Sequence, residues 1–147
     1  MTRIAVLGAG LIGREHAGLI VAHPATELAA ICDPSPAAEA LAARLSVPHF
    51  ADYVAGLEAV RPDGAIVALP NQLHEAAALA CIERGIASLV EKPVADTVAA
   101  GARIAEASER TGVPVLVGHH RRHSPDIRAA KAVIEGESSG RWWRSTA

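Results

Sequence analysis

Three glycines near the N-terminus have the spacing of a dinucleotide-binding loop. Gly8, Gly10 and Gly13 follow an apolar block at 4–7 and precede a helix-length segment that begins at residue 11. In such a loop the first glycine permits a tight turn, the second lets the backbone approach a pyrophosphate, and the third lets the helix pack closely on the strand. The diphosphate then lies at the positive end of the helix. Because glycine-rich turns also occur for structural reasons, the motif needs further support.

An acidic residue lies where such a loop requires one. Asp33 comes 20 residues after Gly13, at the end of the next apolar block. A carboxylate there can accept hydrogen bonds from both hydroxyls of the adenosine ribose, and it repels the 2′-phosphate of NADP. The alternative is a helix-entry or turn residue in the sequence Asp33-Pro34-Ser35-Pro36. The combined spacing favours cofactor binding, with NAD rather than NADP as the cofactor.

Polar residues also follow two later apolar blocks. Asn71 and His74 come after one block, and Lys92 comes after the next. If these blocks are parallel strands, the polar residues lie at the sheet edge where ligands bind in open α/β folds. A lysine in a cleft can bind a hydroxyl or carbonyl and share in proton transfer. Each residue also has a structural interpretation: Asn71 as an N-cap, His74 as a surface residue of a first turn, and Lys92 as a solvated loop residue.

A run of histidine and arginine covers residues 119–123, after the apolar block at 114–117. Three histidines suggest a metal ion, but ligation needs converging side chains, and neighbouring residues of an extended chain point to opposite sides. We therefore expect no metal here. The run is interpreted as the polar wall of a substrate cleft or, alternatively, as a surface cluster.

The elements that position these residues are short apolar blocks alternating with helix-length segments. Each block is almost entirely apolar, which is typical of strands covered on both faces in a parallel sheet. The expected strands are 4–7, 28–32, 65–69, 88–90 and 114–117, with a weak one at 48–50, and the expected helices are 11–22, 35–45, 53–60, 72–84, 96–111 and 125–135. This alternation predicts an α/β fold of the Rossmann type: a doubly wound, mainly parallel sheet in the order 3-2-1-4-5-6 between two helix layers.

Composition excludes several classes of protein. Fourteen Lys and Arg residues against 16 Asp and Glu residues give a net charge of −2, so no basic excess points to nucleic acid. No apolar run approaches the roughly 18 residues that span a bilayer, and the first residues lack the apolar stretch of a signal peptide. We therefore expect a cytoplasmic protein without a membrane partner. Cys32 and Cys81 are predicted to be buried, reduced thiols.

These motifs, in this order, resemble the Gfo/Idh/MocA family, named for glucose–fructose oxidoreductase, inositol dehydrogenase and a rhizopine catabolism protein. The matching segments are GAGLIG, CDPSP, ALPNQLHEAAALACIERG, EKPVADT and VGHHRRHSP. The resemblance implies an N-terminal Rossmann domain and a C-terminal α/β domain built on a large open sheet. Together they would transfer hydride between NAD(P) and a sugar, cyclitol or related polyol.

The resemblance also implies roles for individual residues. Those that match cofactor-binding positions are Gly8, Gly10, Leu11, Ile12, Gly13, Asp33, Leu69, Pro70, Asn71, His74, Glu91 and Lys92. Within this set Lys92 also acts in catalysis, and the Pro93 that follows it is often in a cis bond. His120 and Arg121 match the segment that usually lines the substrate side.

The resemblance covers the chain to about Arg141. We therefore expect a Rossmann domain over residues 1–140 and an aberrant or truncated tail over 141–147, with the substrate domain absent. The family's catalytic histidine, and the aspartate that commonly precedes it, belong to that second domain, so neither role falls on this chain. An uncovered interdomain face would favour a homo-oligomer. The alternative function is a non-catalytic nucleotide-binding module, a sensor or a partner subunit.

The tail contains both tryptophans, Trp142 and Trp143. In the family this segment usually continues as Gly-Arg-Val-Val-Ala-Val. Removing one G from GC-rich codons for that sequence gives Gly-Arg-Trp-Trp-Arg-Ser-Thr, which matches the tail. A frameshift is therefore our hypothesis for these residues, and an isolated domain with its own tail is the alternative.

Overall fold

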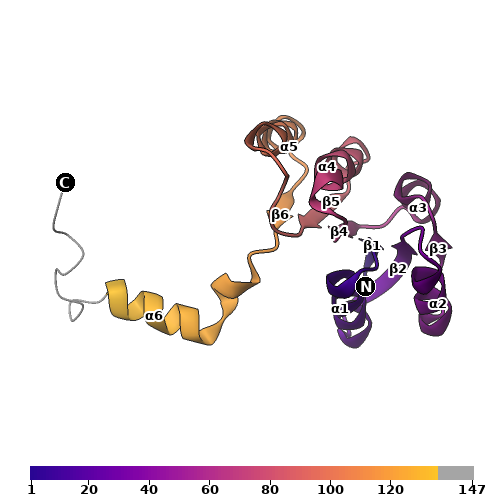
Figure 1. The fold of residues 1–147 in the computed structure, drawn as a ribbon, viewed down its shortest axis with the longest axis horizontal. Helices are drawn as coiled ribbons and strands as arrows, with labels where there is room; N and C mark the ends of the chain where they lie inside the picture. Colours follow the sequence, from indigo (N-terminus) through magenta and orange to yellow (C-terminus); the bar gives the residue numbers. More distant parts are fainter. Residues whose placement is uncertain (136–147) are drawn as a thin grey trace.

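Short apolar strands form the middle layer of the molecule, and helices cover both of its faces (Figure 1). The computed structural model describes residues 1–135. The strands are β1 (Thr2–Leu7), β2 (Thr26–Cys32), β3 (His49–Phe50), β4 (Gly64–Val67), β5 (Ala87–Val90) and β6 (Val115–Val117). They pair in the order β3-β2-β1-β4-β5-β6, and every pair is parallel. The predicted Rossmann-type fold and its strand order are confirmed.

The connecting segments are helical. They are α1 (Leu11–Ala22), α2 (Pro36–Leu45), α3 (Tyr53–Val60), α4 (His74–Glu83), α5 (Val98–Thr111) and α6 (Pro125–Glu135), with 3₁₀ turns η1 (Asn71–Leu73) and η2 (His120–His123). The expected tail at 141–147, with its tryptophans, lies outside the described residues.

Helix starts follow the capping chemistry of the sequence. The Ser35 side chain accepts a hydrogen bond from the N–H of Ala38 at 3.3 Å, and Pro36 occupies the first position of α2. The helix expected from residue 96 instead begins at Val98. The side chain of Thr97, rather than that of Asp96, accepts the hydrogen bond from the first turn, so Thr97 is the N-cap.

The helix expected over 72–84 also begins differently. A 3₁₀ turn, η1, comes first, with Pro70 as its N-cap, and the α-helical pattern starts only at His74. The interpretation of Asn71 as an N-cap is therefore wrong: Asn71 is the first residue of the 3₁₀ turn.

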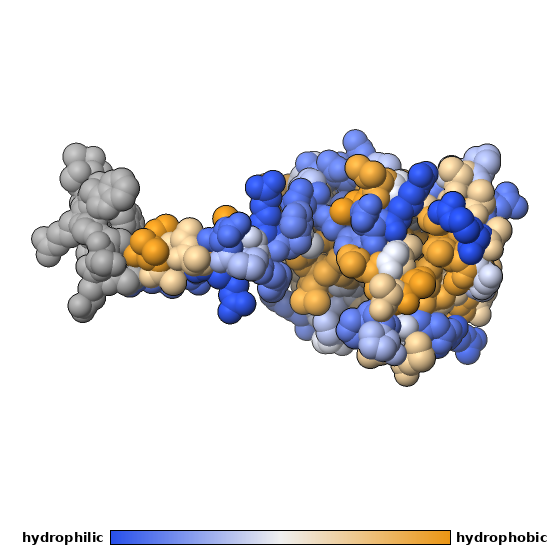
Figure 2. All heavy atoms as spheres, turned by 90° about the horizontal axis from the view of Figure 1, so that it is seen from below, coloured by the Kyte–Doolittle hydropathy of each residue, from blue (hydrophilic) through white to orange (hydrophobic). Residues whose placement is uncertain are grey.

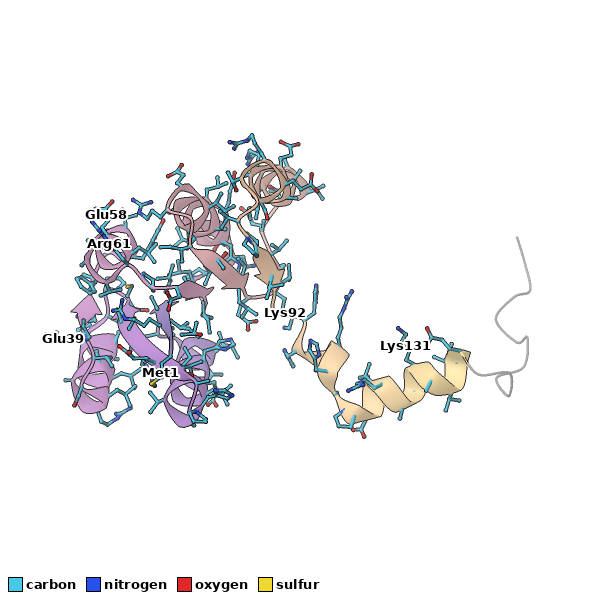
Figure 3. The ribbon with its side chains drawn as sticks, turned by 180° about the vertical axis from the view of Figure 1, so that it is seen from behind. Met1, Glu39, Glu58, Arg61, Lys92 and Lys131 are labelled. Atoms are coloured by element: carbon cyan, nitrogen blue, oxygen red, sulfur yellow. The ribbon has the colours of Figure 1, made fainter. Side chains whose placement is uncertain are left out.

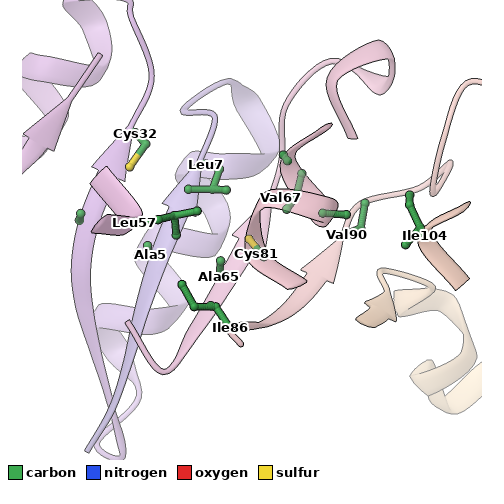
Figure 4. Packing of buried hydrophobic residues seen from close by; sticks show 13 residues of the cluster. Ala5, Leu7, Cys32, Leu57, Ala65, Val67, Cys81, Ile86, Val90 and Ile104 are labelled. Atoms are coloured by element: carbon green, nitrogen blue, oxygen red, sulfur yellow. The ribbon is translucent and has the colours of Figure 1, made fainter. Parts of the chain in front are cut away.

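Two clusters of small aliphatic side chains fill the space between the layers. One packs α3, α4 and α5 against one face of the sheet, and the other packs α1 and α2 against the opposite face. Figure 4 shows the first cluster, in which Leu57 lies beside Leu7 and Ile104 lies beside Val90.

Cys32 and Cys81 belong to this first cluster. Both thiols are free and buried, as predicted, and burial raises the pKa of each to about 12. They are therefore protonated, unreactive core side chains.

One part of the sheet lacks a helix. On the α1 side, a hollow of about 430 Å³ lies over β4, β5 and β6, lined by Ile66, Leu89, Leu116 and other residues. Figure 2 shows hydrophobic surface on this face of the body. Helix α6 projects away from the sheet and leaves Ile127, Val133 and Ile134 exposed (Figure 1). Within residues 1–135, no helix has the length and apolar character needed to cross a membrane.

Candidate functional site

The parallel sheet gathers the polar segments at one edge. All six strands run in the same direction, so the segments that follow β1, β2, β4, β5 and β6 meet at their carboxyl ends. Chain order reverses between β1 and β4, and ligands of open α/β sheets bind at such a reversal. The candidate site is therefore this carboxyl edge.

The three glycines of the first loop differ in what an added Cβ atom would meet. Gly8 has a φ of +93°, and a Cβ on it would lie 2.5 Å from the carbonyl oxygen of Ala68. A Cβ on Gly13 would overlap the carbonyl oxygen of Gly8, so α1 approaches the strand only because that position is glycine. A Cβ on Gly10 would meet no atom within 4 Å. Packing therefore requires two of the glycines, while Gly10 borders open space.

This open space fits the pyrophosphate of a dinucleotide. Helix α1 starts at Leu11, and its N-cap, Gly10, supplies no side-chain hydrogen bond. The first N–H groups of a helix have no partner within it, and they lie at the positive end of its dipole. The side chains of Leu11 and Ile12 are exposed, so they leave these backbone groups accessible. A phosphate beside Gly10 would supply the missing acceptors.

Asp33 joins the glycine loop to the segment after β2. One carboxylate oxygen accepts a hydrogen bond from the N–H of Ala9 at 2.8 Å, and the other accepts one from the N–H of Ser35 at 2.8 Å. Burial opposes ionisation, but these hydrogen bonds, with the Ser35 side chain and the charge of His49, lower the pKa of Asp33. The carboxylate is therefore ionised at neutral pH and points to the same edge as the loop.

His74 lies inside the protein. Its ring is 1% exposed, with Nδ1 2.9 Å from the carbonyl oxygen of Pro93 and Nε2 2.8 Å from that of Leu69. Because carbonyl oxygens only accept, the protonated ring donates to both and a neutral ring to one. The interpretation of His74 as a surface residue is wrong, and both ring nitrogens are engaged by backbone. In contrast, Pro70 and Asn71 are exposed at the edge.

The segment after β5 carries Glu91, Lys92 and Pro93, and the Lys92–Pro93 bond is cis. Glu91 accepts a hydrogen bond from Nε2 of His16 on α1 at 2.8 Å. Burial again opposes ionisation, but the His16 hydrogen bond, the N–H of Lys92 and the charges of His16 and His120 lower the pKa of Glu91. Lys92 is exposed beside the chain that leads to α6 (Figure 3).

The basic run after β6 meets Lys92. A small cavity of about 110 Å³ is lined by Lys92, His119, His120, Arg121 and Arg122. The structure thus brings together the two expected substrate-side residues, His120 and Arg121, and the expected catalytic lysine. Among residues 1–135 no group of three or more His, Cys, Asp or Glu side chains is placed to hold a metal ion.

Two residues of this edge escaped the sequence analysis. His16 lies three positions after Gly13, on the same face of α1, and this spacing is the sequence signal that points to it. Gly118 lies so close to Glu91 that a Cβ on it would be 3.0 Å from a carboxylate oxygen. A Cβ at position 118 would therefore make a tight contact that the Glu91 carboxylate would have to shift to relieve.

Comparison with known proteins gives concordant results. The model of an oxidoreductase family with an NAD-binding Rossmann fold, GFO_IDH_MocA, matches residues 2–119. The chain is 34% identical over 142 residues to the inositol 2-dehydrogenase of Streptomyces avermitilis, an alignment that covers 94% of this chain and 41% of that protein.

Solved structures agree with this result. The WlbA dehydrogenase of Bordetella pertussis, in complex with NADH and UDP-GlcNAcA, has 29% identity and a TM-score of 0.86, covering 91% of this chain and 42% of that one. The scyllo-inositol dehydrogenase of Lactobacillus casei, with bound NAD(H) and scyllo-inositol, shares the fold with a TM-score of 0.86 at 21% identity, covering 91% of this chain and 41% of that one. The chain spans about 41% of the length of the curated inositol 2-dehydrogenase that it matches.

Proposed function

Because the chain belongs to the Gfo/Idh/MocA family of oxidoreductases, whose NAD-binding Rossmann fold it shares, we propose that it is the cofactor-binding part of a dehydrogenase acting on a sugar, cyclitol or polyol. One observation carries the proposal. An uncapped helix start with open space at Gly10 lies beside an ionised Asp33 at the carboxyl edge of the sheet. These are the two features that a dinucleotide requires of a protein.

Each segment of this edge has a part in binding. The N–H groups of Gly10, Leu11, Ile12 and Gly13 would hold the pyrophosphate, and Asp33 would accept hydrogen bonds from the adenosine ribose. Leu69, Pro70 and Asn71 would lie beside the second ribose and the nicotinamide. His74 is buried, so it would not touch the cofactor directly. Its two ring nitrogens contact the backbone carbonyls of Leu69 and Pro93, and it would position the site through these two segments.

Lys92 would bind the substrate hydroxyl, and its positive charge would assist the loss of the hydroxyl proton to a base. Lys92, His120 and Arg121 line the same small cavity, so a polar substrate there meets all three. The bound cofactor would supply the redox chemistry by accepting hydride from the substrate carbon, and the protein would supply the positioning.

Asp33 is the basis for proposing NAD rather than NADP. Its carboxylate stays charged at neutral pH, and an adenosine 2′-phosphate would meet that charge. No arginine follows Asp33 in the next few positions to neutralise the phosphate. Hydrogen bonds to a charged group contribute about 1.5–3 kcal/mol each, so losing those to the ribose costs NADP about tenfold or more in affinity.

The test has two steps. The first is a fluorescence titration of the 147-residue chain with NADH and with NADPH. The second is an absorbance assay for NAD⁺ reduction with inositols, sugars and linear polyols. Binding with turnover supports the dehydrogenase. Binding without turnover agrees both with the cofactor-binding part of a dehydrogenase and with the alternative, a nucleotide-binding module or partner subunit. Failure to bind either dinucleotide rejects the proposal.

We further propose that the 147-residue chain self-associates through the uncovered sheet face. Leu116 is 63% exposed there, beside the apolar hollow over β4, β5 and β6. Exposed apolar surface of this kind favours association. Sedimentation analysis should show a mass that rises with protein concentration, and Leu116→Lys should reduce the rise. A wild-type chain that stays monomeric across the concentration series excludes the interface.

A further inference from the structure

The Lys92 segment is contacted on both sides by histidines, His16 and the buried His74. Before Lys92, the Glu91 carboxylate accepts a hydrogen bond from His16 of α1. After Lys92, the carbonyl oxygen of Pro93 lies 2.9 Å from Nδ1 of His74, the first residue of α4. The two histidines come from opposite layers, because α1 and α4 pack on opposite faces of the sheet.

The His16–Glu91 contact is partly shielded from water. The two side chains are 18% and 12% exposed, and their nitrogen and oxygen atoms are 2.8 Å apart. A hydrogen bond in such surroundings is stronger than the same bond in water, and either partner left alone would carry a desolvation cost. The contact therefore constrains the positions of α1 and the Glu91 segment relative to each other.

Glu91 has further neighbours that leave it little freedom. Its second carboxylate oxygen lies 3.3 Å from the N–H of Lys92, and its own N–H donates to the carbonyl oxygen of Val67 at 2.9 Å. Gly118 closes the remaining side, since a Cβ there would lie 3.0 Å from the carboxylate. A shift of α1 would therefore move His16 and, through the hydrogen bond, the Glu91 carboxylate, whose other contacts limit its freedom to adjust.

The Lys92 ammonium itself has no such anchor. Within the described part of the chain, no hydrogen bond or ion pair holds its Nζ atom, and the side chain is exposed. Its location is therefore set by the backbone on either side of it. That backbone is fixed by Glu91 and Pro93, which are the residues the two histidines hold.

His16 also lies close to the dinucleotide loop in sequence. It follows Gly13 by three residues on α1, the helix whose start borders the open space at Gly10. We propose that His16 is a positioning residue that couples the dinucleotide loop to Lys92 through Glu91, with His74 holding the opposite side of the same segment. This inference rests on the proposed function, because the coupling matters only if a dinucleotide binds at the loop.

The chain offers a direct readout of Lys92. It contains two lysines, Lys92 and Lys131. Reductive methylation with ¹³C-formaldehyde therefore labels only these two side chains and the terminal amine, and it keeps their charge. Lys131 lies on α6, away from the site, and serves as an internal control. We expect NADH to shift the ¹³C signal of Lys92 and to leave that of Lys131 unchanged.

The test compares His16→Ala with His16→Gln, whose side-chain amide can still donate to Glu91. We expect His16→Ala to weaken NADH binding about fivefold or more and to lose at least about half of the NADH-induced shift of Lys92. His16→Gln should restore most of both. Leu19→Ala, at an exposed position of the same helix, is the matched control and should change neither. Melting curves show whether each variant is folded.

The outcomes separate the inference from the proposed function. If the wild-type chain does not bind NADH, the proposed function fails. If the wild type binds NADH while folded His16→Ala binds equally well and shows the full Lys92 shift, His16 is only a packing residue and the inference is overturned. Should His16→Ala not fold, Glu91→Gln, which keeps the shape of the side chain but removes its charge, carries the same comparison.

Discussion

The amino and carboxyl ends of the sheet differ in the availability of their polar groups, and the larger hollow lies at the end where these groups already have partners. The amino edge contains the larger hollow, about 680 Å³, lined by Leu57, Glu58, Arg61, Pro62, Asp63, Arg84, Gly85 and Ile86. The carboxyl edge has the cavity of about 110 Å³ at Lys92 and the open space beside Gly10. Figure 3 shows Glu58 on α3 and Arg61 at the end of that helix, well away from Lys92.

Polar groups at the amino edge already have partners. Arg84 donates to the carbonyl oxygen of Ala80 at 2.9 Å and to the carboxylate of Glu58 at 2.7 Å. The Asp63 carboxylate accepts a hydrogen bond from the N–H of Arg3 at 2.7 Å. At the carboxyl edge, by contrast, the start of α1 has no side-chain cap. Available backbone donors, rather than hollow volume, therefore mark the ligand site.

The largest effect is expected from Gly13→Ala. The added Cβ would overlap the carbonyl oxygen of Gly8, and neither backbone segment can move without disturbing β1 or α1. Overpacking of this kind costs about 3 kcal/mol or more. Thermal or urea unfolding should show a strongly destabilised or unfolded chain. A melting temperature equal to that of the wild type would mean that the loop can rearrange and that its tight geometry is not needed.

Gly10→Ala separates binding from folding. Its Cβ would enter the open space where no atom lies within 4 Å, and Gly10 has a φ of −65° that alanine adopts readily. Stability should therefore change little, while NADH binding should weaken about tenfold or more because the methyl group blocks the pyrophosphate. Gly18→Ala, on an exposed turn of the same helix, is the control and should bind NADH normally. Equal binding by Gly10→Ala would place the cofactor elsewhere.

Asp33→Ser tests the choice of cofactor. Removing the charge should weaken NADH binding and relieve the repulsion of the 2′-phosphate, so the ratio of NADPH to NADH dissociation constants should fall several-fold, by about 1–2 kcal/mol. Fluorescence titrations of the wild type and of Asp33→Ser, each with NADH and with NADPH, measure this ratio. A ratio that stays constant would show that Asp33 does not face the ribose.

The Asp33 carboxylate should also affect the stability of the chain at low pH, without any cofactor. Hydrogen bonds from Ala9 and Ser35 hold the pKa of Asp33 below its ordinary value of 3.8. A lowered pKa in the folded state adds stability that is present above 3.8 and lost as the pH falls through the lowered value. The free energy of unfolding should therefore decline below about pH 4, and less steeply in Asp33→Asn. Identical pH slopes for the two proteins would contradict the assignment.

The smallest effect is expected at the amino edge. Arg61→Gly removes a side chain from the larger hollow, and its φ of +43° suits glycine. Affinity for NADH should be unchanged within error, and the fold should be retained. A clear loss of NADH affinity would move the site to the amino edge.

Local patterns were sufficient to predict much of this edge. Apolar blocks predicted the strands, and their alternation with helical segments predicted the sheet order. The glycine spacing and Asp33 were identified because their geometry depends on neighbours within one βαβ unit. The end of β4 and the start of α4 were misplaced, because the 3₁₀ turn after Pro70 has no distinct periodicity.

Residues whose partners are distant in sequence could not be assigned in this way. His16 pairs with Glu91 across 75 positions, and only the packed sheet brings α1 and the end of β5 together. The buried position of His74 could not be predicted from the sequence, because its partners are backbone carbonyls and backbone leaves no signal in the sequence. The close approach of Gly118 to Glu91 likewise becomes evident only in the folded chain.

Mapping NADH on the chain by ¹⁵N NMR tests the central claim most directly. The account predicts that the largest amide shifts on NADH addition fall at Gly8–Gly13, at Asp33 and at Glu91–Lys92. Amides that line the larger hollow, such as those of Arg61 and Gly85, should stay unchanged. Shifts centred on that amino-edge hollow, with a silent glycine loop, would contradict the account.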